Sequence, residues 1–161
     1  AELTAKSQRL EELDAALSVV HDKASEIRSG MKPRETRIRQ LQKLIEQAQN
    51  LRETQSIHDE YKQICWKGKQ EKFAGAHRAD LAVWDAANRY LRANLPDMKL
   101  TPKAWQTELA ALTAENEAEY AKLKAQREEV AELQKVRRYV DVALKADAPQ
   151  KKKTKHHDID R

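Results

Sequence analysis

Residues 61–91 read YKQICWKGKQEKFAGAHRADLAVWDAANRYL, and this stretch contains the signals for a change of chain direction. Gly68 interrupts a helical pattern just after Trp66, and glycine weakens a helix interior more than any residue except proline. Beyond it, apolar side chains recur at the three- and four-residue spacing of one helix face, namely Phe73, Leu81, Trp84, Ala87 and Leu91. We therefore predict a helix that ends near residue 66, a tight turn, and a third helix over residues 70–94.

The composition favours long helices over an ordinary globular core. Charged residues make up 35% of the 161 positions, and there are only three glycines and four prolines. Ala, Glu, Lys, Leu, Arg and Gln dominate, which is typical of coiled coils. The single cysteine excludes an intramolecular disulfide and suits a reducing compartment. Because no signal peptide or long apolar run is present, we expect a cytoplasmic protein without membrane insertion, and the start at Ala1 suggests a piece of a larger protein.

The chain begins with a heptad pattern. Apolar residues recur every seven positions at Leu3, Leu10, Leu17, Ala24 and Met31, with Leu13, Val20 and Ile27 between them. This predicts an amphipathic helix over residues 2–30. Gly30 suits the position after a helix and Pro33 the first turn of the next, so we expect a hairpin and a second helix over residues 33–66. The alternative is one continuous bent helix, because Ile38 and Leu41 keep the heptad phase.

A fourth helix is predicted over residues 102–146. Pro96 stops the third helix, and Thr101 followed by Pro102 is an N-cap and first-turn pair. The apolar stripe of this helix comprises Trp105, Leu109, Leu112, Leu123, Val130, Leu133, Val140 and Leu144, and polar residues occupy core spacing at Asn116, Glu119, Gln126 and Arg137. The third helix is too short to cover this stripe, so part of it must pair with the first or second helix, or with another chain.

These runs predict an all-α fold, an elongated antiparallel helical bundle or coiled coil of three or four long helices within one domain over residues 1–146. We expect up-down-up-down order with left-handed packing, and the first and fourth helices antiparallel. Residues 147–161 contain KKKTK and almost no apolar side chains, which predicts a basic flexible tail. A homodimer is compatible with the uncovered part of the fourth stripe, but the sequence does not determine it.

Positive charge is concentrated around the predicted turn and third helix. The chain has a formal net charge of +5, and the excess lies in residues 62–103. Cations arrayed in this way can neutralise nucleic-acid phosphates in a sequence-independent, salt-sensitive manner. The candidates for such contacts are Lys67, Lys69, Lys72, Arg78, Arg89, Arg92, Lys151, Lys152 and Lys153. A solvated helix face and a solubilising tail explain the same residues.

The tryptophans and the residues of metal-binding type are expected to have packing roles. Trp66 could stack on an unpaired base beside its flanking lysines, but we expect it to close the hydrophobic end of a bundle. Trp84 and Trp105 lie on core stripes, and His77 shares the stripe of Phe73 and Leu81. His58 and Cys65 are seven residues apart on one predicted helix face, yet a metal site needs three or four ligands. We therefore expect no metal and no cofactor.

Catalytic motifs are missing from the sequence. There is no phosphate-binding glycine-rich loop, CxxC, HExxH or nucleophile elbow. We accordingly predict that the chain is not itself an enzyme.

The central stretch nevertheless resembles a known family. Lys72-Phe73, His77-Arg78-Ala79-Asp80, Ala86-Ala87 and Tyr90-Leu91, followed by Leu109 to Leu112, Glu119-Tyr120 and Glu128 to Val136, are similar to the helical region that follows the nuclease domain of MobA/MobL-type relaxases, the mobilisation nucleases of bacterial plasmids and transposons. The resemblance covers about residues 40 to 144. It implies a helical accessory module of a DNA-transfer protein, which contributes DNA contacts or docks to relaxosome and coupling proteins in the bacterial cytoplasm. The nicking tyrosine and the histidine-held metal of that family belong to a separate amino-terminal domain, and no residues here match them.

Two other classes of function remain open. One is a structural coiled-coil adaptor that binds another protein helix and has no nucleic-acid role. The other is a self-standing nucleic-acid binder. DNA titrations at two salt concentrations separate the two, because only a binder shows a steep dependence on salt.

Overall fold

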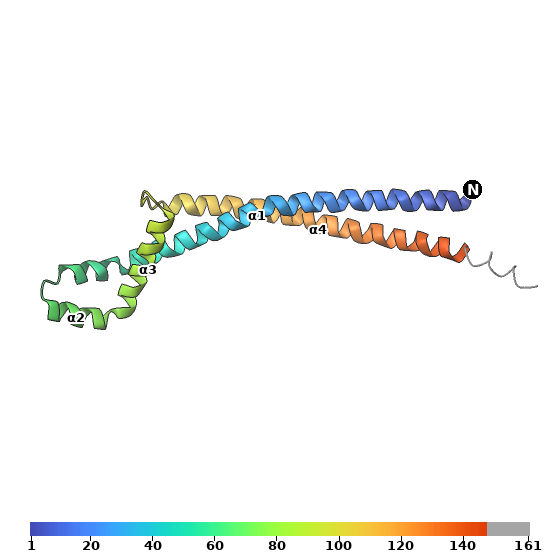
Figure 1. Cartoon of the computed structure of the whole chain (residues 1–161). Coiled ribbons are helices and arrows are strands. Elements are labelled where there is room, and N and C mark those ends of the chain that lie inside the picture. The colour runs from blue at the N-terminus through green and yellow to red at the C-terminus, as the bar shows by residue number, and fades with distance from the viewer. Residues whose placement is uncertain (148–161) are drawn as a thin grey trace, which may run out of the picture. The chain divides into compact units, whose positions relative to one another are not determined.

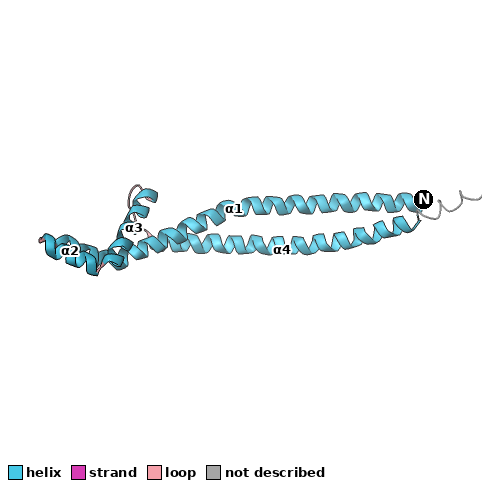
Figure 2. Cartoon of the chain, turned by 60° about the horizontal axis from the view of Figure 1, so that its bottom comes forward, coloured by secondary structure: helices cyan, strands magenta, loops and turns pink. Residues whose placement is uncertain are grey.

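The computed structural model describes residues 1–147, all of which belong to helices or short connections (Figure 1). The helices are α1 (Glu2–Gln63), α2 (Lys67–Ala76), α3 (Arg78–Asn94) and α4 (Pro102–Asp147). No strand occurs in this part of the chain (Figure 2), so the predicted all-α class is confirmed. Only two of the four helices are long. The predicted tail falls, apart from Asp147, outside the described residues.

The predicted hairpin at residues 30–33 is wrong, because α1 continues through both of its signals. Pro33 lies inside α1, and Gly30 does not adopt the positive φ of a helix-terminating glycine. The φ of proline is itself helical, so what the helix loses is mainly one hydrogen bond and some steric freedom. Buried apolar residues stand in heptad phase on both sides, with Met31 at 7% and Leu41 at 0% exposure. Burial of this continuous stripe outweighs the local cost of the two helix breakers.

The chain divides into two compact units. The first combines residues 1–32 with residues 117–147, and we call it the two-helix unit; the second, residues 33–116, is the α2–α3 unit. In the two-helix unit, Ala24 and Met31 of α1 pack with Leu123 of α4, while Asp14 of α1 meets Arg137 of α4. Earlier residues of α1 therefore face later residues of α4. The predicted antiparallel pairing of these segments is present.

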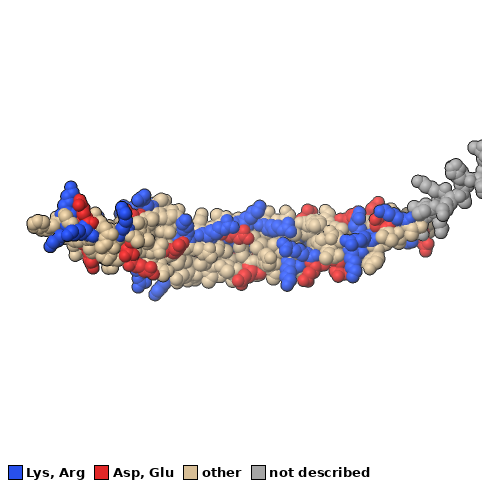
Figure 3. All heavy atoms as spheres, turned by 90° about the horizontal axis from the view of Figure 1, so that it is seen from below, with Lys and Arg blue, Asp and Glu red and all other residues tan. Residues whose placement is uncertain are grey.

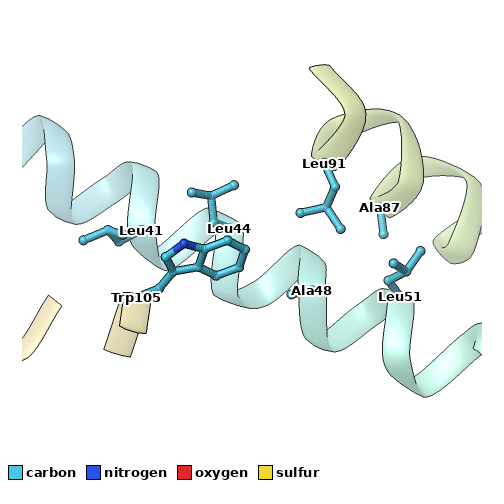
Figure 4. Packing of buried hydrophobic residues seen from close by; sticks show 7 residues of the cluster. All are labelled: Leu41, Leu44, Ala48, Leu51, Ala87, Leu91 and Trp105. Atoms are coloured by element: carbon cyan, nitrogen blue, oxygen red, sulfur yellow. The ribbon is translucent and has the colours of Figure 1, made fainter. Parts of the chain in front are cut away.

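The core of the α2–α3 unit combines three helices (Figure 4). Its buried residues are Leu41, Leu44, Ala48 and Leu51 from α1, Ala87 and Leu91 from α3, and Trp105 from α4. Leu41 and Leu91 are completely buried. Burying one such leucine contributes about 1.5–3 kcal/mol relative to exposing it. The predicted core positions on the third and fourth stripes are thus confirmed at Ala87, Leu91 and Trp105.

Ion pairs between α1 and α4 support the same antiparallel register in the α2–α3 unit. Arg37 makes a two-pronged contact with Glu108, with Nε 2.8 Å from Oε1 and Nη2 3.1 Å from Oε2. Nε of Arg34 lies 3.2 Å from Oε2 of Glu115. The hydrogen bond from Arg37 lowers the pKa of Glu108 below its ordinary value and raises that of the arginine. These arginines therefore have a structural role within the α2–α3 unit.

Candidate nucleic-acid interface

The face of α3 that carries the predicted arginines is exposed because the opposite face is firmly held on α1. Ala87 and Leu91 point into the core (Figure 4). Closer to the start of α3, the Trp84 ring stacks on His58 at a centroid separation of 3.3 Å, with the planes 8° apart. Nε1 of Trp84 donates a hydrogen bond to Oε1 of Gln55 over 3.0 Å. One side of α3 is thereby committed to packing, and the other is left to solvent.

The turn between α1 and the next helix differs from the prediction. α1 ends at Gln63, and α2 begins at Lys67, so Gly68 lies in the first turn of α2 and does not form the break. Backbone N–H groups in a first turn have no partner within the helix, so a weak helix former is tolerated there. Nε2 of Gln70 donates to the carbonyl of Tyr61 over 3.2 Å and so satisfies part of the end of α1.

The predicted helix over residues 70–94 is divided at His77. This residue has φ −115° and ψ 30°, outside the helical range, while its N–H still donates to the carbonyl of Phe73 over 2.9 Å. The ring of His77 lies 4.4 Å from that of Phe73, in agreement with the predicted packing role. No residue of α2 is fully buried, and only Gln70, Phe73 and Ala74 of this helix are partly covered.

The six predicted cations of the helical region are all exposed. Lys67, Lys69 and Lys72 lie on α2, and Arg78, Arg89 and Arg92 lie on α3, and these two helices contact each other. Of the six, only Arg89 forms an ion pair within residues 1–147, with Nη2 3.9 Å from Oδ2 of Asp85, and both groups are exposed. Nε of Arg92 donates to Asn88 over 3.3 Å. The predicted tail lysines Lys151, Lys152 and Lys153 lie outside the described residues.

The distribution of charge is mixed, not of one sign. On the face of the molecule shown in Figure 3, lysine and arginine side chains alternate with aspartate and glutamate. The cations of the α2–α3 unit differ in whether they have an acidic partner. Arg34 and Arg37 are neutralised by acids of α4, whereas the α2 lysines and Arg78 have no ion-pair partner among residues 1–147.

The prediction that Trp66 closes the end of a bundle is wrong. Its side chain is 76% exposed. Because α1 ends at Gln63, Trp66 belongs to the connection and occupies the N-cap position of α2, with φ −88° and ψ 120°. Trp105, at 6% exposure, is the tryptophan that fills the core.

His58 and Cys65, whose spacing would allow two metal ligands on one helix face, do not lie on one helix. Cys65 lies beyond the end of α1 and is exposed, whereas His58 is packed against Trp84 within α1. In the part of the chain that is described, no three His, Cys, Asp or Glu side chains are grouped closely enough to hold a metal ion.

Sequence reasoning missed the pairing of Arg34 and Arg37 with α4. Glu108 and Glu115 are seven residues apart and therefore lie on one helix face, which is the signal that could have found them. The signal is usable only once the register between α1 and α4 is known.

The fold and the site define an all-helical protein with an exposed cationic segment on α2 and α3. Comparisons with protein-family models, curated proteins and solved structures find no match to this chain. No helix within residues 1–147 has a stretch that is long and apolar enough to cross a bilayer.

Proposed function

We propose that this chain is a non-catalytic helical module of a relaxase-type mobilisation protein and that its α2–α3 unit contacts DNA phosphates. The observation that supports this most directly is the set of exposed cations on α2 and at the start of α3 that have no acidic partner in residues 1–147. The same stretch of sequence resembles the helical region of MobA/MobL-type relaxases. Relaxosome or coupling proteins would be the other partners of such a module.

The physical basis of binding is release of the counterions condensed on DNA. Each lysine that neutralises a phosphate adds about 0.9 to the slope of log K against log salt on duplex DNA. Four unpaired cations therefore predict a slope of about −3 to −4, or roughly a hundredfold loss of affinity between about 50 and 200 mM salt. Contacts of this kind carry no base information, so the binding is independent of sequence.

A charge-matched pair of variants tests the proposal. The first is Lys67→Gln, Lys69→Gln and Lys72→Gln in α2 of the full chain, which removes three exposed charges. The control is Lys23→Gln, Lys124→Gln and Lys135→Gln in the two-helix unit, which removes three exposed charges elsewhere. The α2 variant is expected to lose most of the affinity for a labelled duplex and about 2.7 of the slope, whereas the control keeps most of both.

Two results would contradict the proposal. One is equal loss of affinity in the two triple variants, which would mean that only the net charge of the chain matters. The other is absence of binding by the unmodified chain at about 50 mM salt, where phosphate contacts are strongest.

A structural adaptor that binds another helix is the second candidate, and a specific observation favours it. Tyr139 and Val142 of α4 are 69% and 61% exposed, and they line a shallow surface hollow with Ala131. Left-handed coiled-coil packing, inferred from the heptad spacing, would let a further helix add to this face. In this case Tyr139→Ser with Val142→Ser abolishes self-association or partner capture in sedimentation experiments, and the chain does not bind DNA.

A further inference from the structure

Trp66 is more exposed than any other large hydrophobic side chain in the described residues, at 76%. A tryptophan normally buries 150–250 Å² and finds a partner for its indole N–H. Within residues 1–147, neither an aromatic ring nor a hydrogen-bond acceptor meets this side chain. The Trp66 side chain therefore adds little to the stability of the folded unit, which points to a role in binding.

The backbone nevertheless holds Trp66 in a defined place. The carbonyl of Trp66 accepts the hydrogen bond from the N–H of Gln70 over 2.8 Å, which begins α2. The side chain of Gln70 in turn donates to the carbonyl of Tyr61 in α1. Trp66 is thus displayed at a short connection that is tied to the helices on both sides. A side chain positioned in this way loses less freedom on binding than one on a long loop.

The surroundings of Trp66 are cationic and open. Lys67 and Lys69 follow it in the first turn of α2, and that turn contains no acidic residue. Beyond its chain neighbours and the backbone of its own helix, no atom would lie within 4 Å of a Cβ at Gly68, so a ligand backbone has space to approach between the two lysines. Glu71 is the first acidic residue along α2. A flat aromatic face beside lysines matches a nucleobase and its neighbouring phosphates.

We infer that Trp66 is a stacking platform for an unpaired base, and that Trp66, Lys67 and Lys69 together bind single-stranded DNA in preference to duplex. This inference rests on the proposed function, since it names the strand state that the cationic segment recognises. The bases of a duplex are already stacked on both faces, so the indole reaches one only after the duplex is opened. A bilayer surface suits this site less well, because the residues after Trp66 are lysines and a glycine and supply no second apolar group.

Fluorescence anisotropy of a labelled oligothymidylate and of a duplex of equal length tests the inference on the full chain. Trp66→Ala is expected to weaken single-strand binding roughly tenfold and to change duplex binding by less than about twofold. The reason is that only an unpaired base can stack on the indole. Trp66→Phe keeps a ring and should retain most of the affinity. Tyr120→Ala is the matched control, because Tyr120 is an exposed aromatic residue at 56% with Glu117 and Glu119 nearby in sequence.

A spectroscopic measurement provides a second readout. Trp105 is buried and Trp84 is stacked on His58, so quenching by an added oligonucleotide reports mainly on Trp66. Quenching by oligothymidylate that is present in the unmodified chain and lost in Trp66→Phe is the expected result.

The outcomes separate the inference from the proposed function. If Trp66→Ala binds single strands as well as the unmodified chain does, while the α2 lysine variant loses binding, stacking is refuted and the proposed function stands. If Trp66→Ala weakens single-strand and duplex binding equally, the preference for single strands is refuted. Absence of binding to either nucleic acid overturns both, and binding of anionic vesicles that depends on Trp66 without single-strand binding assigns the site to a membrane.

Discussion

Replacing Pro33 with alanine is expected to stabilise the protein, because this proline lies inside α1 and not in a turn. Without an N–H, Pro33 cannot donate to the carbonyl four residues earlier, and its ring crowds that carbonyl. Gly30 provides a second test within the same helical turn, since it too lies in α1 without a positive φ. Both residues are exposed, so neither substitution disturbs the core.

The expected magnitudes follow from helix propensities. Proline costs about 3 kcal/mol relative to alanine in a helix interior, and loss of its restriction on the unfolded chain offsets about 0.4–1 kcal/mol of the gain. With some relaxation of the helix around the ring, we expect Pro33→Ala to raise the free energy of unfolding by about 1–2 kcal/mol. Gly30→Ala should add about 0.5–1 kcal/mol.

Urea denaturation followed by far-UV circular dichroism measures both effects. A gain of 1–2 kcal/mol raises the transition midpoint by about 0.5–1 M at the slopes usual for small proteins. The alternative, a hairpin at residues 30–33, predicts that both variants lower the free energy of unfolding. Gly30 would then occupy the left-handed position after a helix, where alanine costs about 1–2 kcal/mol, and Pro33 would favour the native turn. Destabilisation by both substitutions would refute the continuous helix.

Three further outcomes are expected from the core and from the ion pairs. Leu91→Ala should lower the free energy of unfolding by about 2–5 kcal/mol, because the side chain is completely buried; a loss below about 1 kcal/mol in urea denaturation would show that α3 is not packed as described. Trp105→Ala should cost about 3–5 kcal/mol and Trp66→Ala less than about 0.5 kcal/mol, and comparable losses in thermal unfolding would contradict the exposure of Trp66. The pKa of Glu108 is lowered by Arg37 in the folded protein, so the stability from this pair is present above the ordinary value of 4.5 and is lost as the pH falls through the lower folded value. Glu108→Gln should therefore flatten the dependence of stability on pH in that acidic range, and an unchanged pH profile would argue against the pair.

Periodicity predicted that these segments are helical, but it predicted both ends of a helix only for α4, and the reasons for this limit are physical. The start of α4 follows from Thr101 and Pro102, whose effects act within one helical turn. The break at His77 was not predicted: Gly75 lies two residues before it, but a single glycine within a helical pattern is a weak stop signal. The end of α1 was predicted near residue 66 from Gly68, three residues too late. Gly68 lies inside the first turn of α2, so this glycine does not mark where α1 ends.

The candidate site was predictable as a set of residues but not as a surface. The six cations on α2 and α3 could be named from their spacing, and all six are exposed. The sequence did not show that Arg34 and Arg37 are neutralised while these six remain exposed. That difference depends on which acidic residues of α4 lie opposite α1. The exposure of Trp66 was also misjudged, because it depends on α1 ending three residues before it.

The amino-acid sequence alone determined that this protein is helical, where α4 begins, and which faces of the helices are apolar, because these properties arise from interactions within a few residues of one another. Only the tertiary structure decided whether Gly30 and Pro33 break α1, which arginines are neutralised, and which tryptophan is buried. In each of these cases a local preference of a few kcal/mol or less competes with burial against a partner segment that is distant in sequence. The outcome depends on the register between the two segments, which neither contains by itself.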